Sequence, residues 1–346
     1  MNTDLIKKQK YEYMVCVHCL TYNHAKYLRK CLEGFVMQKT SFPYIVVIVD
    51  DASTDGSQSI ILEYTERYPK LIQPVLLKEN HYSLKKSIEP YYEPFVKKSK
   101  YVAFCEGDDF WIDPEKLQKQ YDALEKHPDC KVCVHKVEKL FENGESQNKY
   151  LPSFSQRTGL IVSKKFIRMF CVDYPFQTSS YFVTGRDYYN YNKSDVHFGN
   201  MSKSADRSII MYFGQLANAY YLDVIMSCYR VGSVGSHNER MINNPHFREE
   251  TFSNIDGMTK AFDDYTKHKY HKECLLNLKR YRYNRVVIAH FAGEITTEQY
   301  EKEIVKKDYR LFFKMDNPLK VRLLIYLNVY FPYIGKFVKQ HFVHSK

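Results

Sequence analysis

Three carboxylates stand close together in the stretch from Cys105 to Trp111. Glu106, Asp108 and Asp109 directly follow an apolar run at 101–104 that predicts a buried strand. Carboxylates packed this closely repel one another unless a positive charge lies between them. Hard oxygen ligands suit Mg²⁺ or Mn²⁺, so the pattern favours a site for one of these ions. The alternative is a solvated acidic turn.

A second acidic pair, Asp50 and Asp51, ends a β-branched run at 44–49. Carboxylates at the end of a parallel strand can accept hydrogen bonds from a base N–H or from ribose hydroxyls. Ser53 and Asp55 are alternative caps for the helix that follows. We expect two acidic sites on neighbouring strand ends, one holding a nucleoside and the other a metal on its diphosphate.

The surrounding elements alternate between strand and helix. Strands are predicted at 14–19, 44–49 and 71–77, and helices at 27–35 and 60–68. This alternation is typical of a parallel α/β sheet. Further strands are expected at 131–135, 179–184 and 220–229, whereas 141–157 and 190–204 are expected to be polar loops. After residue 237 the pattern becomes mostly helical.

The composition narrows the class of protein. The chain has 346 residues and a net charge of +11, and residues 260–346 hold 18 Lys and Arg against 9 Asp and Glu. A basic tail favours an anionic partner such as nucleic acid, a membrane surface or a phosphorylated lipid. Nine cysteines without paired metal-type spacing and a polar start without an export signal predict the cytoplasm. No stretch reaches the length of a membrane-spanning helix.

Three motifs in order resemble the family 2 glycosyltransferases, which have the GT-A fold and use nucleotide-activated sugars. They are Thr21-Tyr22-Asn23-His24, Ile48-Val49-Asp50-Asp51-Ala52-Ser53-Thr54-Asp55-Gly56 and Glu106-Gly107-Asp108-Asp109-Phe110-Trp111. The likeness is close over 14–134 and looser to about 236. It implies a Rossmann-like, mostly parallel sheet flanked by helices. We therefore expect a GT-A domain over 1–240 and a basic helical extension over 241–346.

The resemblance also implies roles for single residues. Asp50 and Asp51 would bind the nucleoside, with Thr21, Tyr22 and Asn23 beside the base. The family's Asp-x-Asp metal motif falls on Glu106-Gly107-Asp108, with Glu in place of the first Asp, so Asp108 is the better candidate ligand for Mn²⁺ or Mg²⁺. Asp109 and Trp111 would face the acceptor.

Later in the chain, Ala205-Asp206-Arg207 stands at a predicted helix start. In similar bacterial proteins an acidic residue here is the catalytic base, and an inverting transfer needs a carboxylate to take the acceptor proton. The alternative role for Asp206 is a helix N-cap. Arg230 is a candidate diphosphate ligand because guanidinium pairs with phosphate at two points. His237 is a candidate for reaching the metal or the diphosphate, or is simply exposed.

These observations predict an inverting glycosyltransferase that moves a sugar from a nucleotide-diphosphate donor, with UDP favoured, to a glycan or lipid-linked hydroxyl of a bacterial surface polysaccharide. A sugar nucleotidyltransferase would need a glycine-rich phosphate loop near 19–24, which is missing. A non-catalytic glycan- or membrane-binding protein on a decayed transferase fold would have lost carboxylates, yet both clusters are intact. No nucleic-acid recognition motif occurs. The basic amphipathic stretch at 319–331 predicts either peripheral membrane contact or packing on the domain.

Overall fold

The computed structural model describes residues 11–141, 146–172, 174–194, 205–232, 240–241, 244–291 and 293–303, and five single residues further on, at 323, 327, 331, 333 and 334. The chain forms two compact units. The first comprises 1–167, 174–196 and 205–240, and the second comprises 168–173, 197–204 and 241–346.

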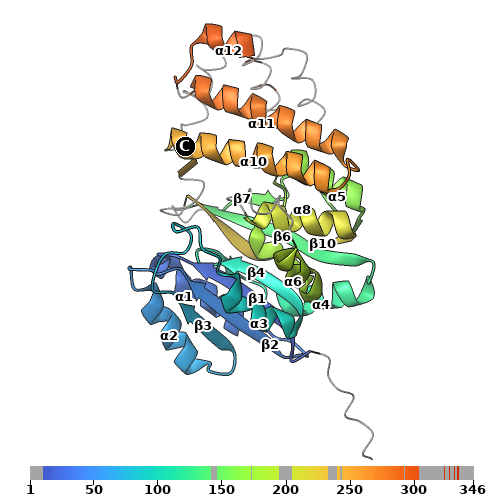
Figure 1. The fold of residues 1–346 in the computed structure, drawn as a ribbon. Helices are drawn as coiled ribbons and strands as arrows, with labels where there is room; N and C mark the ends of the chain where they lie inside the picture. The colour runs from blue at the N-terminus through green and yellow to red at the C-terminus, as the bar shows by residue number, and fades with distance from the viewer. Residues whose placement is uncertain are drawn as a thin grey trace, which may run out of the picture. The chain divides into compact units, whose positions relative to one another are not determined.

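The first unit is built on one mixed sheet (Figure 1). Its main path runs β3-β2-β1-β4-β9-β6-β10-β5, with β7 paired to β6 and β8 to β10. The strands are β1 Tyr13–Thr21, β2 Tyr44–Asp50, β3 Ile72–Leu76, β4 Ser99–Glu106, β5 Phe110–Trp111, β6 Cys130–Phe141, β7 Ser146–Leu151, β8 Gly159–Ile161, β9 Phe182–Thr184 and β10 Asn218–Val231.

The first four strands of this path pair in parallel, as the alternation of strand and helix predicts. Strand β9 then lies antiparallel between β4 and β6, and β10 runs parallel to β6. The sheet is therefore parallel in its N-terminal half and mixed beyond β4.

Helices cover both faces of the parallel half of the sheet. Successive side chains of each strand point to opposite faces, so both faces carry apolar residues that need covering. Val15 and Val17 on β1 face helices α1 Ala25–Val36, α2 Ser57–Arg67 and α4 Lys116–Lys126, with which they share one hydrophobic core. His18 faces the opposite side, where its ring lies 4.1 Å from Tyr92 of α3 Glu89–Lys97. Helix α6 Gly185–Lys193 packs on this second face through Tyr188.

Three expectations for the middle of the chain are wrong. The stretch 190–204, expected to be a polar loop, begins inside helix α6 Gly185–Lys193. The stretch 141–157, expected to be a polar loop, contains β7, which pairs antiparallel with β6. The stretch 179–184 divides into a 3₁₀ turn, η1 Thr178–Ser180, and the short strand β9. The sequence does not predict strand β7 because its residues are mostly polar. A strand that pairs on one side only can lack the apolar alternation by which strands are recognised.

The second unit is helical over its described residues, as expected for the C-terminal extension. Helices α10 Pro245–Tyr265, α11 His271–Phe291 and α12 Thr297–Glu303 follow one another. Asn244 caps α10 by accepting the backbone N–H of Phe247 at 3.0 Å, with proline at the first helical position. Phe252, Ile255 and Tyr281 form a core between α10 and α11.

The described residues contain no helix long and apolar enough to cross a membrane. The basic amphipathic stretch at 319–331 lies outside the described residues except for three single positions, at 323, 327 and 331. Its membrane contact stays a prediction.

Candidate active site

The carboxyl ends of β1, β2 and β4 meet at one edge of the sheet. Thr21 pairs with Asp50, and Leu20 pairs with Glu106. Strand β1 therefore lies between the two acidic strand ends, and the expectation that these ends are direct neighbours is wrong. Two strand spacings, about 10 Å, separate them. The loop after β1 lies in between and can reach both.

The carboxylates of the first acidic pair hold the chain around them. Asp50 is fully buried and accepts hydrogen bonds from the Ser53 backbone, the Ser53 hydroxyl and the Gln58 amide. Asp51 accepts the backbone N–H groups of residues 81–82 at 2.6 and 3.0 Å. A carboxylate offers about four acceptor sites, so Asp51, which is only half-buried, keeps capacity for a ligand. Of the two, Asp51 is better placed to meet a nucleoside.

The loop after β1 is fixed to the loop after β2. The backbone N–H of Asn23 donates to the Ser53 hydroxyl at 2.8 Å, and the Asn23 side chain accepts from the Thr54 backbone at 2.9 Å. These bonds use the Asn23 side chain for positioning. Tyr22 beside it is 47% exposed, so its ring is available for stacking on a planar ligand.

Gly107 permits this loop to lie against the end of β4. A Cβ atom at residue 107 would stand 2.6 Å from the Thr21 hydroxyl oxygen and 2.9 Å from His24 Nδ1. Both atoms are buried, and neither makes a hydrogen bond with any of the described residues. Since buried polar atoms are normally hydrogen-bonded, these two mark a place where a ligand or water would be bound.

The carboxylates of Glu106, Asp108 and Asp109 converge, with one oxygen of each lying within 4.8 Å of the others. Burial, followed by the charges of Asp108 and Asp206, raises the pKa of Glu106 to about 8. Burial and the same cluster of charges also raise the pKa of Asp109 well above its usual range. A divalent cation would relieve this repulsion, so the donor set fits a hard metal ion.

Asp109 differs from the other two carboxylates because it is almost fully buried and each of its oxygens accepts a hydrogen bond. One accepts the Gln177 side-chain amide at 2.6 Å, and the other accepts the Arg230 backbone N–H at 2.9 Å. The residue is 1% exposed. Asp109 therefore ties the acidic turn to β10 and to the segment before η1, and its burial leaves Glu106 and Asp108 as the more accessible candidate metal ligands.

The structure brings Asp206 to the same site. Its charge is one of the causes of the raised pKa of Glu106, a residue far away in sequence. The Asp206 carboxylate accepts hydrogen bonds from the hydroxyls of Tyr174 and Thr178. The Tyr174 hydroxyl in turn lies 2.8 Å from that of Tyr181. Burial, and then the Asp206 charge, raises the pKa of both phenols, so they stay protonated and available as donors.

The cap alternative for Asp206 does not fit the structure. An N-cap residue precedes the helix and accepts from the second or third helical N–H. Asp206 is instead the second residue of α8 Ala205–Leu216, and its carboxylate accepts the backbone N–H of the next residue, Arg207, at 2.8 Å. The Asp206 carboxylate points toward Tyr174, whose hydroxyl contacts that of Tyr181.

Two cations lie beside the acidic turn. The Arg230 guanidinium is 4.9 Å from the Tyr27 ring and 5.0 Å from the Phe110 ring, and Lys30 Nζ is 4.0 Å above Phe110. The buried Nε of Arg230 makes no hydrogen bond within the part of the chain that the structure describes. These contacts are with aromatic rings, so the guanidinium N–H groups can still donate hydrogen bonds to a phosphate.

The remaining predicted site residues are placed differently. Trp111 is 2% exposed, packs edge-on against Phe35 at 4.8 Å and carries Lys116 Nζ 4.0 Å above its ring. The Trp111 ring is part of the hydrophobic core, so it is not exposed to contact an acceptor. His237 lies outside the described residues.

Sequence reasoning missed the residues that hold the site together, namely Tyr174, Gln177, Thr178 and Tyr181. All four come from the run 174–181 between α5 Ser163–Val172 and β9. A run of aromatic and polar residues before a strand is the only local signal for them. It does not indicate which carboxylate each side chain will meet.

A parallel βαβαβ half-sheet with acidic strand ends at one edge and a mixed second half defines the GT-A class of sugar transferases. The comparisons agree. The glycosyl transferase family 2 model matches residues 16–200, and the chain belongs to this family. Both the fold class and the type of enzyme expected from the sequence are confirmed.

Curated relatives match part of the chain. An uncharacterized protein of Mycobacterium tuberculosis is 40% identical over 154 residues, which is 44% of this chain and 42% of that protein. TuaG of Bacillus subtilis, which carries the name of a teichuronic acid biosynthesis glycosyltransferase, is 31% identical over 114 residues, or 32% of this chain and 42% of TuaG. The matched region thus spans less than half the length of these relatives.

A solved structure matches more of the chain. The crystal structure of Staphylococcus aureus TarS residues 1–349 in complex with UDP has a TM-score of 0.56 at 16% identity, covering 96% of this chain and 92% of that one. At this identity the match shows the fold alone.

Proposed function

We propose that this chain transfers a sugar from a nucleotide-diphosphate donor, with UDP as the favoured nucleotide, to an acceptor hydroxyl with inversion at the anomeric carbon. One observation carries the proposal. The Asp206 carboxylate, held by Tyr174 and Thr178, lies beside the acidic turn, because Gln177, the residue before Thr178, binds Asp109 of that turn. An inverting transfer needs such a pairing of a proton acceptor with a diphosphate site.

The donor would lie along the loop after β1. Asp51 has acceptor capacity for a base N–H or a ribose hydroxyl, and Tyr22 presents an exposed ring beside it. Arg230 offers its guanidinium to the diphosphate. UDP is favoured because TarS, which has the same fold, has been solved in complex with UDP and with UDP-GlcNAc.

Glu106 and Asp108 would hold a Mn²⁺ or Mg²⁺ ion, which when bound neutralises the charge of the departing diphosphate. In the transfer, the acceptor hydroxyl proton passes to the Asp206 carboxylate. The acceptor oxygen forms a bond to the anomeric carbon as the bond to the diphosphate oxygen breaks. The electron pair of that bond leaves with the nucleotide. Tyr174 and Thr178 keep the carboxylate oriented toward the acceptor.

The acceptor proposed is a glycan or a lipid-linked intermediate of a bacterial surface polysaccharide, supported by the name that TuaG carries. We also propose that the transferase domain spans 1–240 and that the basic extension over 241–346 brings it to the inner face of the cytoplasmic membrane. The net excess of basic residues over 260–346 supports this placement.

Titration calorimetry with UDP, with and without Mn²⁺, tests the donor site. The wild type should bind UDP more tightly with Mn²⁺, and Asp108→Asn should lose that gain. Glu66→Gln is the control because Glu66 is an exposed carboxylate on α2 and should bind as the wild type does. Equal UDP binding with and without Mn²⁺ in the wild type would contradict the metal-assisted site.

A further inference from the structure

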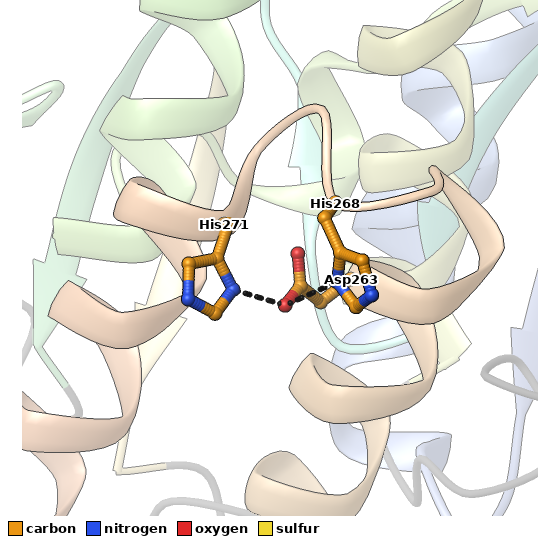
Figure 2. A group of neighbouring side chains, drawn as sticks. All are labelled: Asp263, His268 and His271. Atoms are coloured by element: carbon orange, nitrogen blue, oxygen red, sulfur yellow. Dashed lines mark hydrogen bonds and ion pairs between the residues drawn. The ribbon is translucent and has the colours of Figure 1, made fainter.

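The turn between α10 and α11 gathers a second group of metal-ligating side chains, in the other compact unit. Asp263 lies in the last turn of α10, His268 in the connecting turn and His271 at the first position of α11. Figure 2 shows both imidazole rings directed at the carboxylate. The Nδ1 atoms of His271 and His268 lie 2.7 and 3.2 Å from the same oxygen, Asp263 Oδ2.

The two oxygens of the Asp263 carboxylate have different surroundings. Asp263 is 8% exposed, and its other oxygen, Oδ1, is buried without a hydrogen bond from any residue that the structure describes. One oxygen thus contacts two imidazoles, while the other accepts no hydrogen bond from the described part of the chain. Since buried polar atoms are normally satisfied, the arrangement is incomplete as a purely hydrogen-bonded turn.

The backbone holds the histidines in place. Lys267 and His268 have φ angles of 50° and 62°, a left-handed conformation that few residues other than glycine adopt. The chain therefore folds back on itself, and the His268 backbone N–H donates to the Asp263 carbonyl at 2.8 Å. This turn carries the His268 ring to the side of Asp263 where His271 also points.

We propose that Asp263, His268 and His271 bind a divalent transition-metal ion of the imidazole-preferring class, with Zn²⁺ as its reference member. Two imidazoles and one carboxylate suit Zn²⁺ and Ni²⁺, whereas Mg²⁺ prefers oxygen ligands alone. Three protein ligands leave a further position for water. The ion would join the end of α10 to the start of α11.

The distances fit with a small adjustment. Zinc bonds of about 2.0–2.1 Å in a tetrahedron place ligand atoms about 3.3–3.4 Å apart. The His268 contact is already close to this, and the His271 ring would draw back by about 0.6–0.7 Å. Both side chains are more than half exposed, at 63% and 51%, so this movement meets little resistance.

The site differs in class from the carboxylate pair at Glu106 and Asp108, and the experiment uses this difference. Untagged full-length protein is saturated with Mg²⁺, which occupies oxygen-only sites, and then titrated with Zn²⁺ by calorimetry. The wild type should bind one more equivalent of Zn²⁺ than the double variant His268→Gln/His271→Gln. Loss of a single ligand, in His271→Gln, should weaken Zn²⁺ binding by at least about tenfold. Mutating a residue that only hydrogen-bonds to a metal ligand already costs about this much.

His246→Gln is the matched control because His246 is an exposed histidine of α10 away from the turn. It should bind Zn²⁺ as the wild type does. The exposed histidines should be replaceable without loss of folding, and equal melting temperatures of wild type and variants without metal check this. Zn²⁺ should then raise the melting temperature of the wild type and the control only.

Equal Zn²⁺ stoichiometry and affinity in the wild type and the double variant would overturn the proposal and leave Asp263 as a hydrogen-bond acceptor for the turn. Loss of binding in His246→Gln to the same degree would overturn it too, because the zinc would then be held elsewhere. Asp263→Asn keeps the shape of the side chain and removes its charge. It should weaken Zn²⁺ binding, and unchanged binding would exclude the carboxylate as a ligand.

Discussion

Replacing Asp206 by Asn tests the assignment of the catalytic base. Asn keeps the shape of the side chain but cannot take a proton from an acceptor hydroxyl. General base catalysis contributes a factor on the order of 10²–10⁴ to a rate. The variant should therefore lose sugar transfer by this factor, which corresponds to about 2.7–5.5 kcal/mol of barrier. Binding of UDP should persist because the proposed role of Asp206 is to face the acceptor and not the donor.

The structure also predicts a cost in stability. Both Asp206 oxygens face donors, Tyr174 and Thr178 on one side and the Arg207 backbone on the other. Asn offers only one acceptor oxygen, so its amide N–H₂ must face a donor. An unsatisfied buried group costs about 1–3 kcal/mol. Rotation of the Tyr174 hydroxyl to accept from the amide would bring the cost to the lower end of that range.

Release of UDP from a panel of UDP-sugars, with water as the acceptor, measures the rate without knowledge of the natural acceptor. Tyr174→Phe is the paired variant. It removes a hydrogen bond to a charged group, worth about 1.5–3 kcal/mol, but leaves the carboxylate. The two variants should lose similar stability in urea unfolding, and only Asp206→Asn should lose most of its rate. Near-normal turnover in Asp206→Asn, or an equal loss in Tyr174→Phe, would refute the assignment.

Further predictions concern the metal ligand, the loop after β1, a buried lysine and the tail. Asp108→Ala should abolish metal-dependent UDP binding in calorimetry while the circular dichroism spectrum stays unchanged. Gly107→Ala should destabilise the fold by about 1–3 kcal/mol in urea unfolding and weaken UDP binding, because its Cβ would stand 2.6 Å from the Thr21 hydroxyl. Burial lowers the pKa of Lys116 to about 7, from about 10.4 in an unfolded chain. Between these two pKa values, Lys116 is protonated in the unfolded chain and largely neutral in the folded one, so the unfolded chain binds more protons. Stability should rise from pH 7 to 10 by at most about 1.4 kcal/mol per pH unit, and Lys116→Met should remove this slope in urea unfolding. Truncation after Asp316 should release the protein from anionic vesicles in co-sedimentation, since each lost basic residue near the surface contributes about 1 kcal/mol. Equal sedimentation of both forms at low salt would place the tail elsewhere.

The pattern of residues along the chain is enough to predict the N-terminal half-sheet and its acidic ends. Apolar residues recur at intervals of two in the strands and of three or four in the helices, and this local periodicity reflects which face is buried. The helical face predicted from Tyr27 to Phe35 is buried in α1 as expected. Asp50 and Glu106 could be placed at strand ends for the same reason, since each directly follows a buried run.

Which of these residues lie close together depends on the folded arrangement of distant segments. Strand order depends on pairing between distant segments, so no local pattern shows that β1 separates β2 from β4. The polar strand β7 and the antiparallel strand β9 are stabilised by partners that lie far away in the chain.

The same reason explains the site. The residue type of Asp206 marked it as a base or a cap, and its contact with Tyr174 favours the base. Asp109 was expected to face the acceptor, but hydrogen bonds from Gln177 and Arg230 make it an anchor. Trp111 was expected on the acceptor side, but packing against Phe35 draws it into the core. Hydrogen bonds and side-chain packing join residues across the fold, so the chemistry a residue can perform is set by neighbours that its own stretch of sequence does not contain.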